Sequence, residues 1–219
     1  MDPKLVIFDC DGVLVDTERM VNASLAEMVT ELGFPINGPE CQQRFMGRTL
    51  ENVKEMVEVL TGRSLPDDWP DKVRKRDLEV FAAGVPAITG VADVLDKLDR
   101  RNLPYCVGSS GKYAKMRTTL GSSGLLPRFQ GRLFSAEDCA NGKPAPDVFL
   151  LAASTMGYPP EDCVVIEDSL PGVQAARSAG MAVYAYVEDP ACDREALSDA
   201  GAHLFDDMST LPGLLFSKP

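Results

Sequence analysis

Two carboxylates stand directly behind an apolar run near the start of the chain, in the stretch LVIFDCDGVLVDTE (5–18). The run 5–8 predicts a buried strand, and Asp9 and Asp11 follow it two residues apart. Like charges a few ångströms apart raise each other's pKa and cost stability unless positive charge lies between them. A carboxylate held beside a cation can act as a nucleophile, and a second one can give and take a proton. The chain must therefore supply positive charge at this place.

Polar residues also follow three later strand-like runs. Ser109 ends the run 104–109 and is followed by Ser110 and Gly111, and Lys143 lies in the stretch NGKP beyond the run 132–135. The acids Glu167 and Asp168 end the run 162–168. In open α/β sheets, ligands bind outside the carboxyl ends of the strands. The sequence therefore predicts that acids, hydroxyls and one lysine converge on one edge of a sheet.

Each of these stretches also has an ordinary structural interpretation. DCDG can form a turn with a helix cap, and the two serines can cap a helix that begins near residue 112. Lys143 can be a solvated loop residue, and Glu167 and Asp168 can be acids favoured at a helix N-terminus. It is improbable that all four interpretations hold at once, at four successive strand ends. Several acids in one pocket call for a divalent cation, and oxygen-only ligands favour Mg²⁺.

The predicted chemistry is covalent. One acid close to Mg²⁺ can attack as a nucleophile, as in enzymes that form an aspartyl-phosphate, and the acid two residues away can transfer protons. Ser109 and nearby backbone N–H groups can hold phosphoryl oxygens at the start of a helix. Lys143 supplies a fixed positive charge. Mg²⁺ and Lys143 together would neutralise the carboxylates.

The elements that position these residues alternate between strand and helix. Most strand-like runs are continuously apolar, which is typical of parallel strands covered on both faces. The expected strands are 4–9, 104–109, 132–135, 162–168, 181–187 and 202–205, and the expected helices between them are 91–101, 112–121, 145–157, 171–179 and 193–200. This alternation predicts a Rossmann-like, doubly wound α/β fold.

The alternation of strands and helices is interrupted between residues 16 and 85, where only helical periodicity is found. Helices are expected from Val21 to Leu32, from Leu50 to Leu60 and over 70–82, with glycines ending the first two. We expect Arg44 and Arg48 to flank Gly47 in a loop between helices of this insert. The chain is thus predicted to consist of an α/β core, 1–15 and 86–219, and an all-helical cap, 16–85.

Four motifs carry a resemblance to a known family: DCDGVLVDTE, VGSSG, GKPAPDVF and VVIEDSLPGVQAARSAGM. In this order they resemble the motifs of the haloacid dehalogenase-like (HAD) hydrolase superfamily, over nearly the whole chain. The resemblance implies that Asp9 is the nucleophile and Asp11 the acid/base. It implies a metal site made by Asp9, the Asp11 carbonyl and Asp168, with Glu167 close by. It also implies that Ser109, with Ser110, and Lys143 bind the transferring phosphoryl group.

The helical insert resembles the C1-type cap of the branch that contains β-phosphoglucomutases, phosphoglycolate phosphatases and sugar-phosphate phosphatases. The stretches RLFSAEDCANGKPAPDVF and MGRT are most similar to the phosphatase subset that includes 6-phosphogluconate phosphatases. We expect hydrolysis of a small phosphorylated metabolite, with Arg48 and Gly47 of the cap loop binding its non-reacting end.

Three other functions are alternatives to hydrolysis for a chain with these motifs. A phosphomutase of the β-phosphoglucomutase type is the main alternative, but the cap histidine and arginine of that family are replaced here by Val21 and Leu50. A metal-free dehalogenase would lack Asp11 and the pair Glu167-Asp168. A non-catalytic sugar-phosphate-binding protein could lose Asp11 or Lys143, yet both are present.

Composition and local sequence limit the kinds of partner and the cellular location that are expected. Lys and Arg number 22 against 33 Asp and Glu, a net charge of −11, which argues against a nucleic-acid partner. None of the six cysteines forms a CxxC pair, so buried free thiols in a reducing compartment are expected. No stretch has the length and apolarity of a membrane span, and the start MDPKLVIF does not resemble a signal peptide. We expect a cytoplasmic monomer, with the single histidine, His203, in a structural role.

Overall fold

The computed structural model describes residues 2–45 and 48–216. It divides the chain into two compact units, one formed by residues 1–15 and 86–219 and the other by residues 16–85. We call them the core unit and the cap unit and describe each by itself.

The core unit is built on a six-stranded sheet. Its strands are β1 (Leu5–Phe8), β2 (Tyr105–Ser109), β3 (Leu133–Ser135), β4 (Cys163–Glu167), β5 (Ala182–Tyr186) and β6 (His203–Phe205). They are parallel and lie in the order β3-β2-β1-β4-β5-β6. From β1 the chain runs through β2 to β3 toward one edge of the sheet, and from β4 it runs through β5 to β6 toward the other edge. The space beyond the carboxyl ends of β1 and β4 is therefore the switch point of the sheet. The predicted α/β fold class and its six strands are confirmed.

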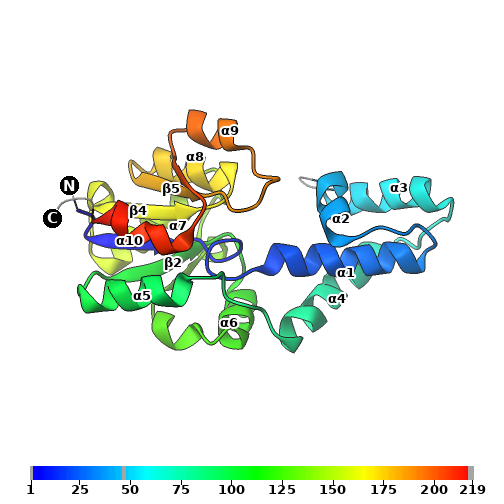
Figure 1. Cartoon of the computed structure of the whole chain (residues 1–219), viewed down its shortest axis with the longest axis horizontal. Helices are drawn as coiled ribbons and strands as arrows, with labels where there is room; N and C mark the ends of the chain where they lie inside the picture. Colours follow the sequence, from blue (N-terminus) through cyan, green and yellow to red (C-terminus); the bar gives the residue numbers. More distant parts are fainter. Residues whose placement is uncertain (1, 46–47, 217–219) are drawn as a thin grey trace. The chain divides into compact units, whose positions relative to one another are not determined.

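Helices cover both faces of this sheet. They are α5 (Val91–Arg100), α6 (Tyr113–Ser122), α7 (Asp147–Met156), α8 (Leu170–Ser178), α9 (Arg194–Asp199) and α10 (Leu211–Leu215), with 3₁₀ turns η1 (Leu126–Phe129), η2 (Ala136–Asp138), η3 (Pro160–Asp162) and η4 (Met208–Thr210). Figure 1 shows α8 and α9 on one side of the sheet and α5 and α6 on the other. Leu5 and Ile7 pack in one cluster with Phe149 of α7 and Val173 of α8. Every residue of β1 is buried, because both of its faces are covered.

The cap unit is a group of helices with its own core. Its helices are α1 (Thr17–Glu31), α2 (Gly38–Phe45), α3 (Leu50–Thr61) and α4 (Trp69–Ala83). Leu25, Val29, Val57 and Trp69 belong to one buried cluster. Gly62 ends α3 in the left-handed conformation that favours glycine, with φ 66°. Because this cluster is internal to the cap unit, these helices pack as a body of their own.

Helix α2 was not predicted, and the prediction that Arg44 lies in a loop is wrong. Arg44 lies in the last turn of α2 rather than in a loop, with its guanidinium 5.6 Å from the centroid of the Phe34 ring. The helix begins with a capping box, since the Asn37 and Glu40 side chains each accept a 3.0 Å hydrogen bond from the backbone N–H of the other. Helix α2 begins with Gly-Pro, a pair typical of a turn, and for this reason the capping box was not recognised in the sequence. Gly47 lies outside the described residues.

Two properties of the described chain bear on its environment. Within residues 2–45 and 48–216, none of the helices combines the length and the apolar character that a membrane crossing needs. All six cysteines carry free thiols, and four of them are buried, namely Cys10, Cys41, Cys106 and Cys163.

Candidate active site

Three carboxylates meet at the switch point of the sheet. Phe8 and Ile166 are opposite each other in the register of β1 and β4, so Asp9 follows β1 beside the end of β4. The Asp9 N–H donates a 2.8 Å hydrogen bond to the Ile166 carbonyl, which fixes the backbone there. One side-chain oxygen from each of Asp9, Glu167 and Asp168 lies within 4.8 Å of the others. Such a buried cluster of acids is stable only if it binds positive charge.

Lys143 supplies positive charge to this cluster. Its Nζ donates to Asp9 Oδ1 at 2.5 Å and to Glu167 Oε1 at 2.7 Å, and its side chain is only 5% exposed. It also lies 4.6 Å from the centroid of the Phe149 ring. Burial lowers the pKa of Lys143, but the charges of Asp9 and Glu167 outweigh burial and raise that pKa overall. The lysine is therefore held as an ammonium ion between two acids.

Asp9 is buried deeply enough to change its protonation. Burial raises the pKa of Asp9 to about 7, Lys143 acts against burial, and the charges of Glu167 and Asp11 raise the pKa further. A bound cation would favour the ionised carboxylate and lower this pKa. A cation beside Asp9, in addition to Lys143, would therefore favour the ionised form of this carboxylate.

Glu167 organises the start of α8. Its Oε2 accepts hydrogen bonds from Asp168 N at 2.8 Å, from Ser169 N at 2.7 Å and from Ser169 Oγ at 2.9 Å. Ser169 in turn is the N-cap of α8 and accepts from Gly172 N. Both Glu167 oxygens are thus engaged, one by Lys143 and the other by the backbone after β4.

Asp168 points at the turn that follows β1. Gly12 has φ +79°, and a Cβ atom at this position would lie 1.9 Å from Asp168 Oδ2. Only glycine gives this turn both its backbone conformation and room for the carboxylate. The sequence DCDG therefore makes a turn that receives Asp168, in addition to carrying two acids.

Ser109 belongs to a loop pinned from two sides. Its buried Oγ accepts a 3.0 Å hydrogen bond from Gly111 N, and Ser135 Oγ donates to the Gly111 carbonyl at 2.7 Å. The Ser109 hydroxyl can still donate its own proton to a ligand oxygen. The N-cap of α6 is Lys112, without a side-chain cap, so the alternative in which a serine caps this helix is wrong. Ser110 is exposed in the same loop.

Lys115 of α6 reaches the second aspartate of the DCDG turn. Its Nζ donates to Asp11 Oδ2 at 2.9 Å. The predicted site residues do not include Lys115, Ser135, Ser169 or Gly172. A signal existed for Lys115, because a lysine in the first turn of a helix is disfavoured by the helix dipole and calls for a compensating acid.

The predicted cap residue Arg48 lies in the cap unit just beyond helix α2, and its backbone N–H donates a 3.1 Å hydrogen bond to the carbonyl of Phe45 at the end of that helix. It is exposed and lines a pocket of about 230 Å³ within that unit. Val21 and Leu50, which occupy the positions of the mutase histidine and arginine, line the same pocket with the acids Glu18 and Asp77.

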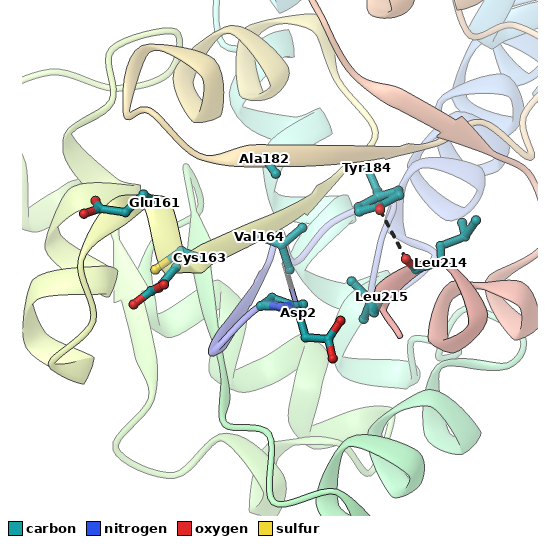
Figure 2. Close-up of a pocket in the computed structure, with 10 residues that line it drawn as sticks. Asp2, Glu161, Cys163, Val164, Ala182, Tyr184, Leu214 and Leu215 are labelled. Carbon is teal, nitrogen blue, oxygen red and sulfur yellow. Dashed lines mark hydrogen bonds between the residues drawn. The ribbon is translucent and has the colours of Figure 1, made fainter. Parts of the chain in front are cut away.

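Another pocket of about 230 Å³ lies at the opposite edge of the core sheet, where the strands begin (Figure 2). It is lined by Cys163 and Val164 of β4, Ala182 and Tyr184 of β5, and Leu214 of α10, among others. The Tyr184 hydroxyl donates to the Leu214 carbonyl at 3.3 Å, as the dashed line shows. The carboxylates of the switch point belong to the other ends of these strands, so this pocket is separate from the candidate active site.

The residues present fit a divalent cation that prefers oxygen ligands. Asp9 uses Oδ1 for Lys143, so its other oxygen can face a cation, and Asp168 lies in the same cluster. Glu167 already accepts hydrogen bonds on both oxygens and is placed to orient the site. Hard carboxylate oxygens with no sulfur in the cluster suit Mg²⁺ rather than zinc or copper.

Comparisons with known proteins agree with this arrangement. The model of the haloacid dehalogenase-like hydrolase family matches residues 3–180. The 6-phosphogluconate phosphatase of Escherichia coli (strain K12) is 32% identical, over 84% of this chain and 83% of its own. A protein of Drosophila melanogaster named "Probable pseudouridine-5'-phosphatase" is 35% identical, over 89% of this chain and 85% of its own.

A solved structure extends the similarity to three dimensions. It is that of a HAD family hydrolase from Deinococcus radiodurans R1 with bound phosphate and sodium, at 27% identity and a TM-score of 0.88, covering 99% of this chain and 96% of the other. The matched model spans β1, β4 and α8, and so includes Asp9, Lys143, Glu167 and Asp168. The chain therefore belongs to the haloacid dehalogenase-like hydrolase family, and its relatives place it among the phosphatases of that family.

Proposed function

We propose that this phosphatase hydrolyses a small phosphorylated metabolite, a sugar phosphate or a phospho-acid, through an aspartyl-phosphate formed on Asp9. The observation that carries the proposal is Lys143, which is bonded to both Asp9 and Glu167 at the switch point of the sheet. Relatives named for hydrolysis of phosphorylated sugars and related metabolites support the substrate class.

In the first step, a carboxylate oxygen of Asp9 attacks the phosphorus atom. The bond from phosphorus to the substrate oxygen breaks, and Asp11, as a carboxylic acid, donates a proton to that oxygen so that an alcohol leaves. The Ser109 hydroxyl and the Lys143 ammonium bind phosphoryl oxygens and stabilise the charge that they carry in the transition state.

In the second step, Asp11 acts as a base. It takes a proton from a water molecule, whose oxygen attacks the phosphorus of the aspartyl-phosphate. The bond to Asp9 breaks, inorganic phosphate is released, and the Asp9 carboxylate is restored. Asp11 ends the cycle protonated, ready to serve as the acid of the next one.

Magnesium is the proposed cofactor. Asp9, Asp168 and the backbone carbonyl of Asp11 would hold it, with Glu167 supporting these ligands. When bound, it neutralises charge on Asp9 and on the phosphoryl oxygens, which brings two anions together.

The experiment that tests this function is phosphate release with an Asp9→Asn variant. Screening sugar phosphates, phospho-acids and nucleotides with Mg²⁺ should find substrates for the wild type. Asp9→Asn should lower kcat by several orders of magnitude while the fold persists, because the covalent route is lost. More than a few per cent of wild-type kcat in the variant would show that Asp9 is not the nucleophile.

Hydrolysis is favoured over phosphomutase activity because the cap positions concerned are apolar. The side chains of Val21 and Leu50, which line the cap pocket, can neither bind a second phosphate nor move a proton. The same screen separates the possibilities: a mutase would convert a sugar phosphate to its isomer with little phosphate release, and a non-catalytic binding protein would do neither.

Partners and location remain predictions. The net charge of −11 leads us to propose that nucleic acid is not a partner and that the protein acts on small metabolites. The free thiols lead us to propose that it does so in the cytoplasm, a reducing compartment. We also propose a monomer, which light scattering coupled to size exclusion would test.

A further inference from the structure

We propose that Lys115 is a positioning residue for catalysis, which holds the Asp11 carboxylate in the place from which it exchanges protons. This inference rests on the proposed function, because it concerns the acid/base of that reaction. Lys115 lies outside the four motifs that carry the family resemblance, and it acts on the reaction through Asp11.

The contact is a direct ion pair between two segments far apart in sequence. Lys115 Nζ lies 2.9 Å from Asp11 Oδ2, and the two side chains are 35% and 24% exposed. Asp11 is thus more exposed than Asp9, whose side chain is 10% exposed. A partly exposed carboxylate can adopt several rotamers, and a charged partner at this distance favours one of them.

Gly111, in the loop after β2 that contains Ser109, shows how closely these groups approach one another. A Cβ atom at position 111 would lie 3.3 Å from Ser109 Oγ and 3.6 Å from Asp11 Oδ2. It would also lie 3.9 Å from Cδ of Lys115. The ion pair is therefore packed against the same loop that places Ser109, so the position of Asp11 is set relative to the predicted phosphoryl site.

Lys143 is already committed to other acids. Both Asp9 and Glu167 accept hydrogen bonds from its Nζ, and its side chain is buried. The two lysines thus pair with different carboxylates. Lys143 donates to Asp9, the proposed nucleophile, and Lys115 donates to Asp11, the proposed acid/base. This division places the two aspartates of the DCDG turn on different cations.

The placement of Lys115 on its helix also calls for a reason. It is the third residue of α6, where the helix dipole disfavours a positive charge. Lys112, the N-cap of the same helix, is exposed, whereas Lys115 is directed to Asp11. A lysine held at this position is explained by its carboxylate partner.

The test uses p-nitrophenyl phosphate, because p-nitrophenolate leaves without needing a proton. Transfer of the phosphoryl group to Asp9 then proceeds without Asp11 as an acid, whereas release of phosphate still requires Asp11 as a base. For Lys115→Met, we expect a burst of about one equivalent of p-nitrophenol at the wild-type rate. Steady-state turnover should then be about ten- to a hundredfold slower, with KM not raised.

Three further variants sharpen the result. Lys115→Arg should recover most of the turnover, because a guanidinium can also pair with a carboxylate. The matched control Lys112→Met should behave as the wild type. In an Asp11→Asn background, Lys115→Met should have no further effect, because a residue that acts only through Asp11 loses its role with it.

Several outcomes would overturn the inference: unchanged turnover in Lys115→Met, a burst slowed as much as turnover, a higher KM with unchanged kcat, or losses that add in the double variant. Suppose that the wild type is active and Asp9→Asn is inactive, as proposed, but that Lys115→Met is fully active. The inference about Lys115 then fails and the proposed function stands. If wild type releases no phosphate from any screened ester, the proposed function fails and the inference falls with it.

Discussion

Gly172 of α8 lies directly against the carboxylate of Glu167. A Cβ atom at position 172 would fall 1.8 Å from Glu167 Oε1 and 2.4 Å from Oε2, so any other residue would displace this carboxylate. Glu167 is the acid that joins Lys143 to the start of α8. The absence of a side chain at position 172 is thus what allows the buried acid to sit beneath the helix N-terminus.

Gly172→Ala should therefore damage both stability and activity. Glu167 is 1% exposed and Lys143 5%, so moving the carboxylate breaks hydrogen bonds in a buried site. We expect a loss of about 1–3 kcal/mol in the free energy of unfolding, typical of overpacking. We also expect kcat to fall by at least about tenfold, because Lys143 loses the acid that holds it beside Asp9. Urea unfolding and phosphate release measure the two effects.

The chain contains a matched control for this change. Helix α10 begins Leu211-Pro212-Gly213, just as α8 begins Leu170-Pro171-Gly172, but a Cβ atom at position 213 would meet nothing within 4 Å. Gly213→Ala should leave activity unchanged and stability equal or slightly higher, by up to about 1 kcal/mol. If Gly172→Ala behaved in the same way, the close contact with Glu167 would carry no energetic weight.

These two LPG sequences show why the site could be predicted only in part. The six strands, their parallel arrangement and the acids at their ends could be predicted from local patterns. Each apolar run and the residues that flank it are neighbours in the sequence. The different roles of Gly172 and Gly213 depend on what packs against each helix, which local sequence does not contain. The pairing of Lys115 with Asp11 joins residues 104 positions apart and was missed for the same reason.

Removal of divalent metal should silence the enzyme. We expect excess EDTA to abolish phosphate release and Mg²⁺ to restore it, because the cluster of Asp9, Glu167 and Asp168 has more negative charge than Lys143 can neutralise. Ca²⁺ should restore it poorly, because its larger and looser coordination shell would misplace Asp9 relative to phosphorus. Full activity in a thoroughly chelated sample would contradict the proposed magnesium site.

Asp168 and Glu167 should respond differently to loss of charge. Asp168→Asn should raise the Mg²⁺ concentration needed for half-maximal activity by at least about tenfold, with little change in stability, because a neutral amide is a weaker metal ligand. Glu167→Gln should instead lower the stability of the metal-free protein by about 1–3 kcal/mol, because charged hydrogen bonds to buried Lys143 are lost. Magnesium titrations and urea unfolding of both variants separate the two roles. Equal shifts in the magnesium requirement would mean that Glu167 is itself a ligand.

Arg48 is the proposed recognition residue of the cap unit. It lines a pocket there with apolar residues and with the acids Glu18 and Asp77, so its guanidinium is a positive group in that pocket. A guanidinium offers paired donors that match a carboxylate or a set of hydroxyls on a metabolite. We propose that it binds the part of the substrate that does not react.

Arg48→Ala should lower kcat/KM for the best substrate of the screen by roughly ten- to a hundredfold, about 1.4–3 kcal/mol. It should barely change turnover of p-nitrophenyl phosphate, whose apolar ring offers the guanidinium no acceptor to bind. Arg44→Ala is the matched control, because Arg44 lies over the Phe34 ring and is not among the residues that line the pocket of Arg48. It should leave both substrates unaffected. Equal losses on both substrates in Arg48→Ala would mean that Arg48 supports the structure of the cap unit, and no loss on either would leave it as an ordinary surface charge.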